Sequence, residues 1–130
     1  VQGISDFLRA ISQVLDRFKG KTTMLTIEVL FFDGCPSWKA GLANLETALD
    51  ELDAPVKVKL IQVEDPDLAQ QERFLGSPSF RANGVDLWPE QRDQYALSCR
   101  MYATPAGLRG APTVEMLKEK LRPLLEQPAA

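Results

Sequence analysis

The 130-residue sequence contains no histidine and only two cysteines, Cys35 and Cys99. The absence of histidine excludes Ser-His and Cys-His nucleophile activation and every metal site that needs imidazole ligands. Two cysteines are too few for a disulfide scaffold, so we expect a reducing, cytoplasmic setting. Any chemistry must therefore depend on cysteine, carboxylate, tyrosine or backbone groups.

Long apolar runs and a strong excess of one charge are also absent. No apolar run approaches the roughly 18 residues of a membrane span, and the apolar residues near the N-terminus are interleaved with charges, unlike those of a secretory signal. The net charge is only −3, which does not indicate nucleic-acid binding. We therefore expect a single globular domain with no membrane partner, no nucleic-acid partner and no cofactor.

Residues 4–18 have the apolar spacing of an amphipathic helix, and Gly20 follows as a C-cap. We assign this helix and its linker to residues 1–23, ahead of a domain at residues 24–130. Its apolar stripe either packs on the domain's own sheet, forms a homodimer contact or lies on a membrane surface. The polar face is not strongly basic, which disfavours the membrane.

The rest of the chain alternates between strand and helix patterns. Residues 26–32 and 54–64 are predicted strands, joined by a predicted helix at residues 37–52, so these strands should be parallel. A further helix is predicted from an Asp65 N-cap and Pro66 to Gly76.

The C-terminal half of the chain adds a predicted hairpin, strand and helix. Asn83-Gly84 predicts a β-hairpin within residues 77–88. Residues 95–103 predict another strand, and a turn-rich connector leads to a last helix at residues 113–125.

The stretch "FFDGCPSW" places Cys35 between a strand and a helix. Gly34 permits a tight turn, Pro36 suits the first helical position, and a helix N-terminus favours the thiolate. A thiolate attacks disulfides and binds soft metals. We interpret Asp33 as a turn residue rather than as a proton acceptor.

Trp38 stands where a CxxC motif has its second cysteine. Cys35 would therefore need glutathione, a partner's thiol or Cys99 to release a mixed disulfide. Trp38 itself is either a core residue or an apolar lid.

Cys99 lies in "YALSCRMY". In an extended strand it shares a face with Tyr95, Leu97 and Met101, which indicates a buried, structural cysteine. We interpret the polar neighbours of Cys99 as surface or rim residues, namely Tyr95, Arg100 and Tyr102.

The order of elements, Cys35 after the first core strand and Pro78 in "GSPSF" together resemble the thioredoxin-like fold over roughly residues 24–126. The resemblance implies an α/β fold with a central mixed four-stranded sheet flanked by helices, to which the N-terminal amphipathic helix is an addition. It also implies that Pro78 is cis and faces Cys35. The backbone edge at Ser77 would then pair with an extended substrate, with Trp38 beside it.

More narrowly, "FFDGCPSW", "FLGSPSF" and "LSCRMYATPAGLRGAP" resemble a small bacterial group of thioredoxin-like proteins labelled alkylmercury-lyase-like. Organomercurial lyases use two cysteines and an aspartate three positions after the first cysteine. Trp38 occupies that position here, so the proton-donating carboxylate is absent from its expected place.

Three functions follow from these patterns. In the first, Cys35 is a monothiol nucleophile that exchanges with a small thiol or a protein disulfide, and Cys99 is a second thiol. In the second, Cys35 and Cys99 together bind a soft metal, mercury(II) or an organomercurial. In the third, the chain is a non-catalytic binding module that assembles through residues 1–23.

Overall fold

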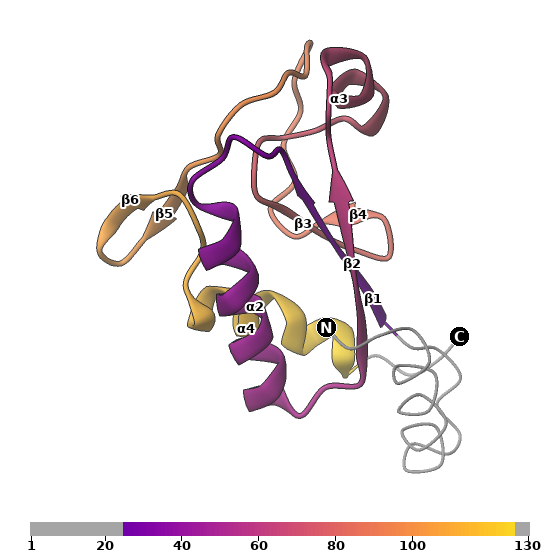
Figure 1. Ribbon diagram of the computed structural model, residues 1–130. Helices are drawn as coiled ribbons and strands as arrows, with labels where there is room; N and C mark the ends of the chain where they lie inside the picture. The colour runs from indigo at the N-terminus through magenta and orange to yellow at the C-terminus, as the bar shows by residue number, and fades with distance from the viewer. Residues whose placement is uncertain (1–24, 127–130) are drawn as a thin grey trace.

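The computed structural model describes residues 25–126, which fold around a central sheet (Figure 1). Within that range the sheet has four strands in the order β2-β1-β3-β4. Their bounds are Leu25–Phe31 (β1), Val56–Gln62 (β2), Ser79–Ala82 (β3) and Val85–Asp86 (β4). Strand β1 is parallel to β2 and antiparallel to β3. The predicted mixed four-stranded sheet flanked by helices is confirmed, whereas the predicted helix at residues 4–18 lies outside the described residues.

Strand β1 is buried on both faces and forms the centre of the core. On one face, Ile27 and Val29 belong to a cluster with residues of α2 (Trp38–Leu52) and α4 (Val114–Leu125). On the other face, Leu30 packs with Val63 and with residues of and after α3 (Pro66–Glu72). Figure 1 shows α2 and α4 side by side, with α3 beyond the far end of the sheet. Strand β1, which leads to Cys35, is therefore packed between these two hydrophobic clusters.

Helix α3 starts as predicted but ends earlier. The Asp65 side chain accepts a hydrogen bond from the Leu68 backbone N–H over 2.8 Å, and Pro66 is the first helical residue. The helix ends at Glu72 rather than at Gly76, because Arg73 adopts a left-handed conformation with φ of 53°. This turn directs Phe74 into the core.

The segments after β2 combine confirmed and wrong predictions. Asn83 and Gly84 form the predicted hairpin turn between β3 and β4, with φ of 52° and 88°. The strand predicted at residues 95–103 is reduced to Tyr102–Thr104 (β5), which pairs with Gly107–Arg109 (β6) inside the predicted connector. Helix α4 follows its predicted range to within one residue. None of the helices in residues 25–126 has both the length and the apolarity needed to cross a bilayer.

Candidate thiol site

Cys35 lies in the turn between β1 and α2, where its backbone N–H donates to the Phe32 carbonyl over 3.1 Å. Its side chain is only 5% exposed. Its Sγ donates a hydrogen bond to the carbonyl oxygen of Ser77 over 3.4 Å. The predicted strand-to-turn placement of Cys35 is therefore confirmed.

Helix α2 begins later than the sequence pattern predicts. Ser37 is the N-cap, and its carbonyl accepts a helical hydrogen bond from the Gly41 N–H over 3.0 Å. The prediction that Pro36 is the first helical residue is wrong, because residues 36 and 37 form a bend before the helix starts at Trp38. Cys35 therefore precedes the N-cap by two residues, and its surroundings depend more on tertiary neighbours than on the helix end.

The Ser77–Pro78 peptide bond is cis, as predicted. Both residues are fully buried, and the Pro78 carbonyl accepts a hydrogen bond from the Tyr102 hydroxyl over 2.5 Å. Helix α2 packs directly against the proline ring, since a Cβ added at Gly41 would lie 2.9 Å from Pro78 Cγ. Gly41 thus allows the helix to approach the cis-proline.

The segment that carries Cys99 runs beside Ser77 and pairs with it. The Ser77 N–H donates to the Ser98 carbonyl over 2.8 Å, and the Arg100 N–H donates to the Ser77 carbonyl over 3.1 Å. These two bonds form an isolated parallel bridge between Ser77 and Cys99. The backbone edge that the resemblance reserves for a substrate is thus bonded to the chain itself.

Cys99 is exposed, and its predicted place on a core face is wrong. Residues 95–101 do not form a regular strand, so the two-residue alternation on which that prediction depends does not apply. Met101 is likewise 56% exposed, whereas Leu97 packs beside the cluster that contains Leu30.

Cys35 and Cys99, 64 positions apart in the sequence, both lie against Ser77: Cys35 Sγ donates to the Ser77 carbonyl, and Cys99 pairs with Ser77 in the parallel bridge. Both are free. Partial desolvation raises the pKa of the Cys99 thiol, and Cys35 raises it further through charge repulsion and a side-chain hydrogen bond. The cysteines of β1–α2 and of residues 98–100 meet at Ser77.

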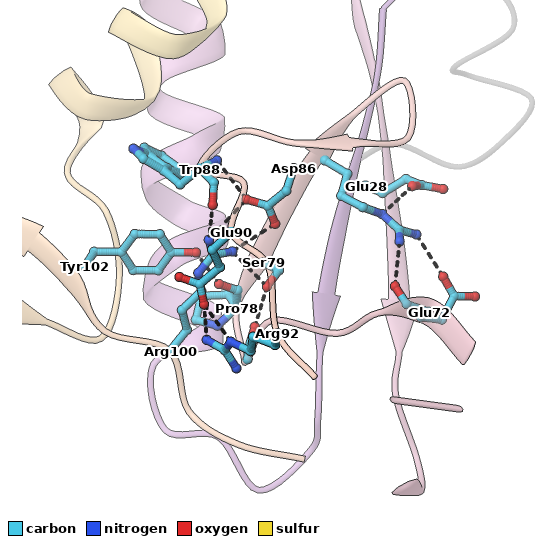
Figure 2. A network of polar contacts seen from close by, with 12 residues as sticks. Glu28, Glu72, Pro78, Ser79, Asp86, Trp88, Glu90, Arg92, Arg100 and Tyr102 are labelled. Carbon is cyan, nitrogen blue, oxygen red and sulfur yellow. Dashed lines mark hydrogen bonds and ion pairs between the residues drawn. The ribbon is translucent and has the colours of Figure 1, made fainter. Parts of the chain in front are cut away.

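The buried side chain of Arg100 holds residues 98–100 in place through hydrogen bonds (Figure 2). Its guanidinium donates to both carboxylate oxygens of Asp86, at 2.9 and 3.1 Å, to Ser79 Oγ at 3.1 Å and to the Trp88 carbonyl at 2.6 Å. Burial lowers the pKa of Arg100, but the hydrogen bond to Asp86 and nearby negative charges outweigh it and raise the pKa overall. The guanidinium thus stays charged, and its hydrogen bonds hold Arg100, the residue after Cys99, in place.

The interpretation of Arg100 and Tyr102 as surface residues is wrong, because both are buried. The Arg100 guanidinium carbon lies 5.1 Å from the centre of the Tyr102 ring. Burial is also the main cause that raises the pKa of the Tyr102 hydroxyl. Sequence reasoning missed Asp86, since nothing in its local pattern indicates a partner 14 positions away.

Gly76 lets the Cys99 segment come close to the cis-proline loop. A Cβ at this position would lie 2.8 Å from Arg100 Cβ and 3.1 Å from the Arg100 backbone N. Gly76 also has a φ of 113°, which L side chains rarely adopt. Both the conformation and the close approach therefore require glycine.

Trp38, Asp33 and Tyr95 have less central places. The Trp38 ring is half-buried and stacks on Phe31, with centroids 4.0 Å apart and an angle of 20° between planes. Asp33 is exposed in the turn, as its interpretation as a turn residue predicts. Tyr95 is half-buried, and its backbone N–H donates to the Gln70 side chain over 3.1 Å.

Among residues 25–126, no three His, Cys, Asp or Glu side chains are grouped to hold a metal ion. No protein-family model and no curated protein matches this chain. Cys35 and Cys99, which meet at Ser77, therefore form the candidate site.

Proposed function

We propose that this chain is a thioredoxin-like protein that uses Cys35 as the nucleophile in thiol–disulfide exchange. The observation that carries the proposal is the position of Cys35 Sγ, 3.4 Å from the carbonyl of Ser77, the residue that precedes cis Pro78 and pairs with Cys99. The strand-turn-helix setting of Cys35 and the mixed sheet around it support the same proposal.

Cys99 supplies the second thiol that a CxxC motif would have at the position of Trp38. A CxxC site resolves its mixed disulfide with the second cysteine of the motif; in this chain the neighbouring thiol comes from residues 98–100. In the net reaction, the thiols of Cys35 and Cys99 become a disulfide, and an external disulfide R–S–S–R is reduced to two R–SH. An external thiol such as glutathione reverses the oxidation of the protein.

The test is the reduction of bis(2-hydroxyethyl) disulfide by the reduced protein without added glutathione, for the wild type and for Cys35→Ser. We expect the wild type to release two molecules of 2-mercaptoethanol per chain and Cys35→Ser at most one, because serine cannot form the internal disulfide. Met101→Ala, which alters an exposed residue of the same segment, is the matched control and should release as much as the wild type. Equal release by the wild type and Cys35→Ser would show that Cys35 takes no part, and cysteines that react only after unfolding would leave a non-catalytic binding module.

A second candidate function is the binding of a soft metal ion such as mercury(II). The contact of both Cys35 and Cys99 with Ser77 favours this function, because thiolates select soft metals. Native mass spectrometry in the presence of glutathione should then show one mercury(II) per chain, lost in either Cys35→Ser or Cys99→Ser. Retention in both single variants would contradict a shared site.

A further inference from the structure

Ser77 has two backbone groups that an extended peptide would need in order to dock beside Pro78. Both are already bonded within the chain, the N–H to Ser98 over 2.8 Å and the carbonyl to Arg100 over 3.1 Å. The same carbonyl also accepts the hydrogen bond from Cys35 Sγ. An incoming polypeptide would have to displace residues 98–100 before it could pair with Ser77.

Displacement of residues 98–100 is opposed by the buried anchor of Arg100. Breaking it would expose a guanidinium that is bound to Asp86, Ser79 and Trp88, and whose side chain is 6% exposed. It would also leave the Asp86 carboxylate, 10% exposed, without its cation. The segment is therefore a built part of the site.

The two thiols differ in their access to solvent. Cys35 is 5% exposed and hydrogen-bonded to Ser77, whereas Cys99 is exposed at the surface of the bridge. A reactant that cannot open the segment meets the sulfur of Cys99 first.

We infer that residues 98–100 occupy the place of a peptide substrate at Ser77, so that Cys99 receives a low-molecular-weight disulfide and Cys35 then attacks Cys99. This inference rests on the proposed function, names its substrate class and gives Cys35 the second of the two nucleophilic attacks, after that of Cys99. The Cys99 thiolate attacks one sulfur of R–S–S–R, forms Cys99–S–S–R and releases R–S⁻. The Cys35 thiolate attacks the Cys99 sulfur, forms the internal disulfide and releases the second R–S⁻. The two released thiolates take up the two protons that the cysteines lost.

The order of the steps is tested with reduced wild type, Cys35→Ser and Cys99→Ser, each mixed with glutathione disulfide, quenched in acid and mapped by peptide mass spectrometry. Serine is nearly isosteric with cysteine, so these variants should fold. We expect Cys35→Ser to accumulate the mixed disulfide on Cys99, and Cys99→Ser to form one on Cys35 at least ten-fold more slowly. Equal rates, or a faster reaction at Cys35, would overturn the inference.

The same variants separate the failure of the inference from that of the proposed function. If Cys99→Ser keeps the wild-type rate of glutathione-dependent reduction while Cys35→Ser loses it, the proposed function stands and the inference is overturned. If neither cysteine of the folded wild type reacts, both fail.

The substrate class is tested by comparing bis(2-hydroxyethyl) disulfide with the disulfides of insulin. We expect the wild type to reduce the small disulfide at least ten-fold faster than insulin. Asp86→Asn weakens the hydrogen bonds of Arg100, so it should reduce this ratio of rates and speed the alkylation of Cys35. Arg81→Ala, which removes an arginine bound elsewhere on the sheet, is the control and should leave both unchanged. Comparable rates for the two substrates in the wild type would show that residues 98–100 do not exclude polypeptides.

Discussion

Arg81 and Arg100 each join separate segments of the chain through acidic partners, but they are buried to different extents. Arg81 on β3 contacts Glu28 on β1 and Glu72 of α3, both over 3.0 Å, and the three side chains are 18–31% exposed. Arg100 and Asp86 are only 6% and 10% exposed. Water can therefore replace a lost partner of Arg81, but it does not reach the buried Arg100–Asp86 pair.

The two arginines also differ in their relation to the thiols. Arg100 follows Cys99 directly and bonds to Ser77 through its backbone N–H. Arg81 instead bonds to Glu28 on β1, which lies directly opposite it in the β1–β3 register. Removal of Arg100 should therefore alter both stability and thiol reactivity, whereas removal of Arg81 should alter stability alone.

The largest effect is expected for Arg100→Ala. It leaves the Asp86 carboxylate buried without a cation, which should cost about 3–5 kcal/mol in the free energy of unfolding. Urea denaturation followed by tryptophan fluorescence measures this loss. Asp86→Ala should cost a similar amount for the reciprocal reason, and losses below about 1 kcal/mol in both variants would show that the pair is not the anchor.

Gly76→Ala should follow in magnitude. The positive φ adds about 1–2 kcal/mol of backbone strain, and the new methyl group, 2.8 Å from Arg100 Cβ, adds about 1–3 kcal/mol of overpacking. Gly84→Ala is the matched control, since Gly84 has a φ of 88° but no atom within 4 Å of the added Cβ.

The difference between the two glycine variants in urea denaturation isolates the close approach of Gly76 to Arg100. If both variants lose the same stability, the approach of the two backbones contributes nothing. Gly76→Ala should also speed alkylation of Cys35, because it pushes residues 98–100 away from Ser77.

Arg81→Ala should have a smaller effect, about 1 kcal/mol, because water reaches the carboxylates it leaves behind. High salt sharpens the contrast between the two arginines. In 1 M NaCl the loss from Arg81→Ala should shrink through screening, while that from Arg100→Ala should persist. A salt-independent loss for Arg81→Ala would place its ion pairs in a less solvated setting.

The smallest effect concerns the pH dependence of Cys99. An ordinary cysteine thiol has a pKa of about 8.5, and the pKa of Cys99 is raised. The alkylation rate of Cys99 should therefore increase at higher pH than that of an ordinary thiol. Cys35→Ser removes the charge repulsion and the thiol hydrogen bond, and the rate profile of Cys99 should move to lower pH. An unchanged profile, read by peptide mass spectrometry, would mean that the two sulfurs do not interact.

Several parts of the fold were predictable because their causes are local. The Asp65 cap with Pro66 depends on residues within one turn of the helix, and the Asn83-Gly84 turn depends on its own two backbone conformations. The cis bond at Pro78 was reached through the resemblance of "GSPSF" and its place after a helix. The alternation argument failed for residues 95–101, because it assumes a regular strand and the segment forms only one bridge.

The sequence by itself determined where Cys35 lies, since an apolar strand followed by Asp33-Gly34 must end in a tight turn. It could not determine that Cys99 lies beside Cys35, or that Arg100 is buried against Asp86. Those contacts join residues tens of positions apart or on separate segments, and no periodicity along the chain records them. Only the packing of residues 98–100 against Ser77 decided them, because Arg100 finds its hydrogen-bond partners there and Gly76 leaves room for its backbone.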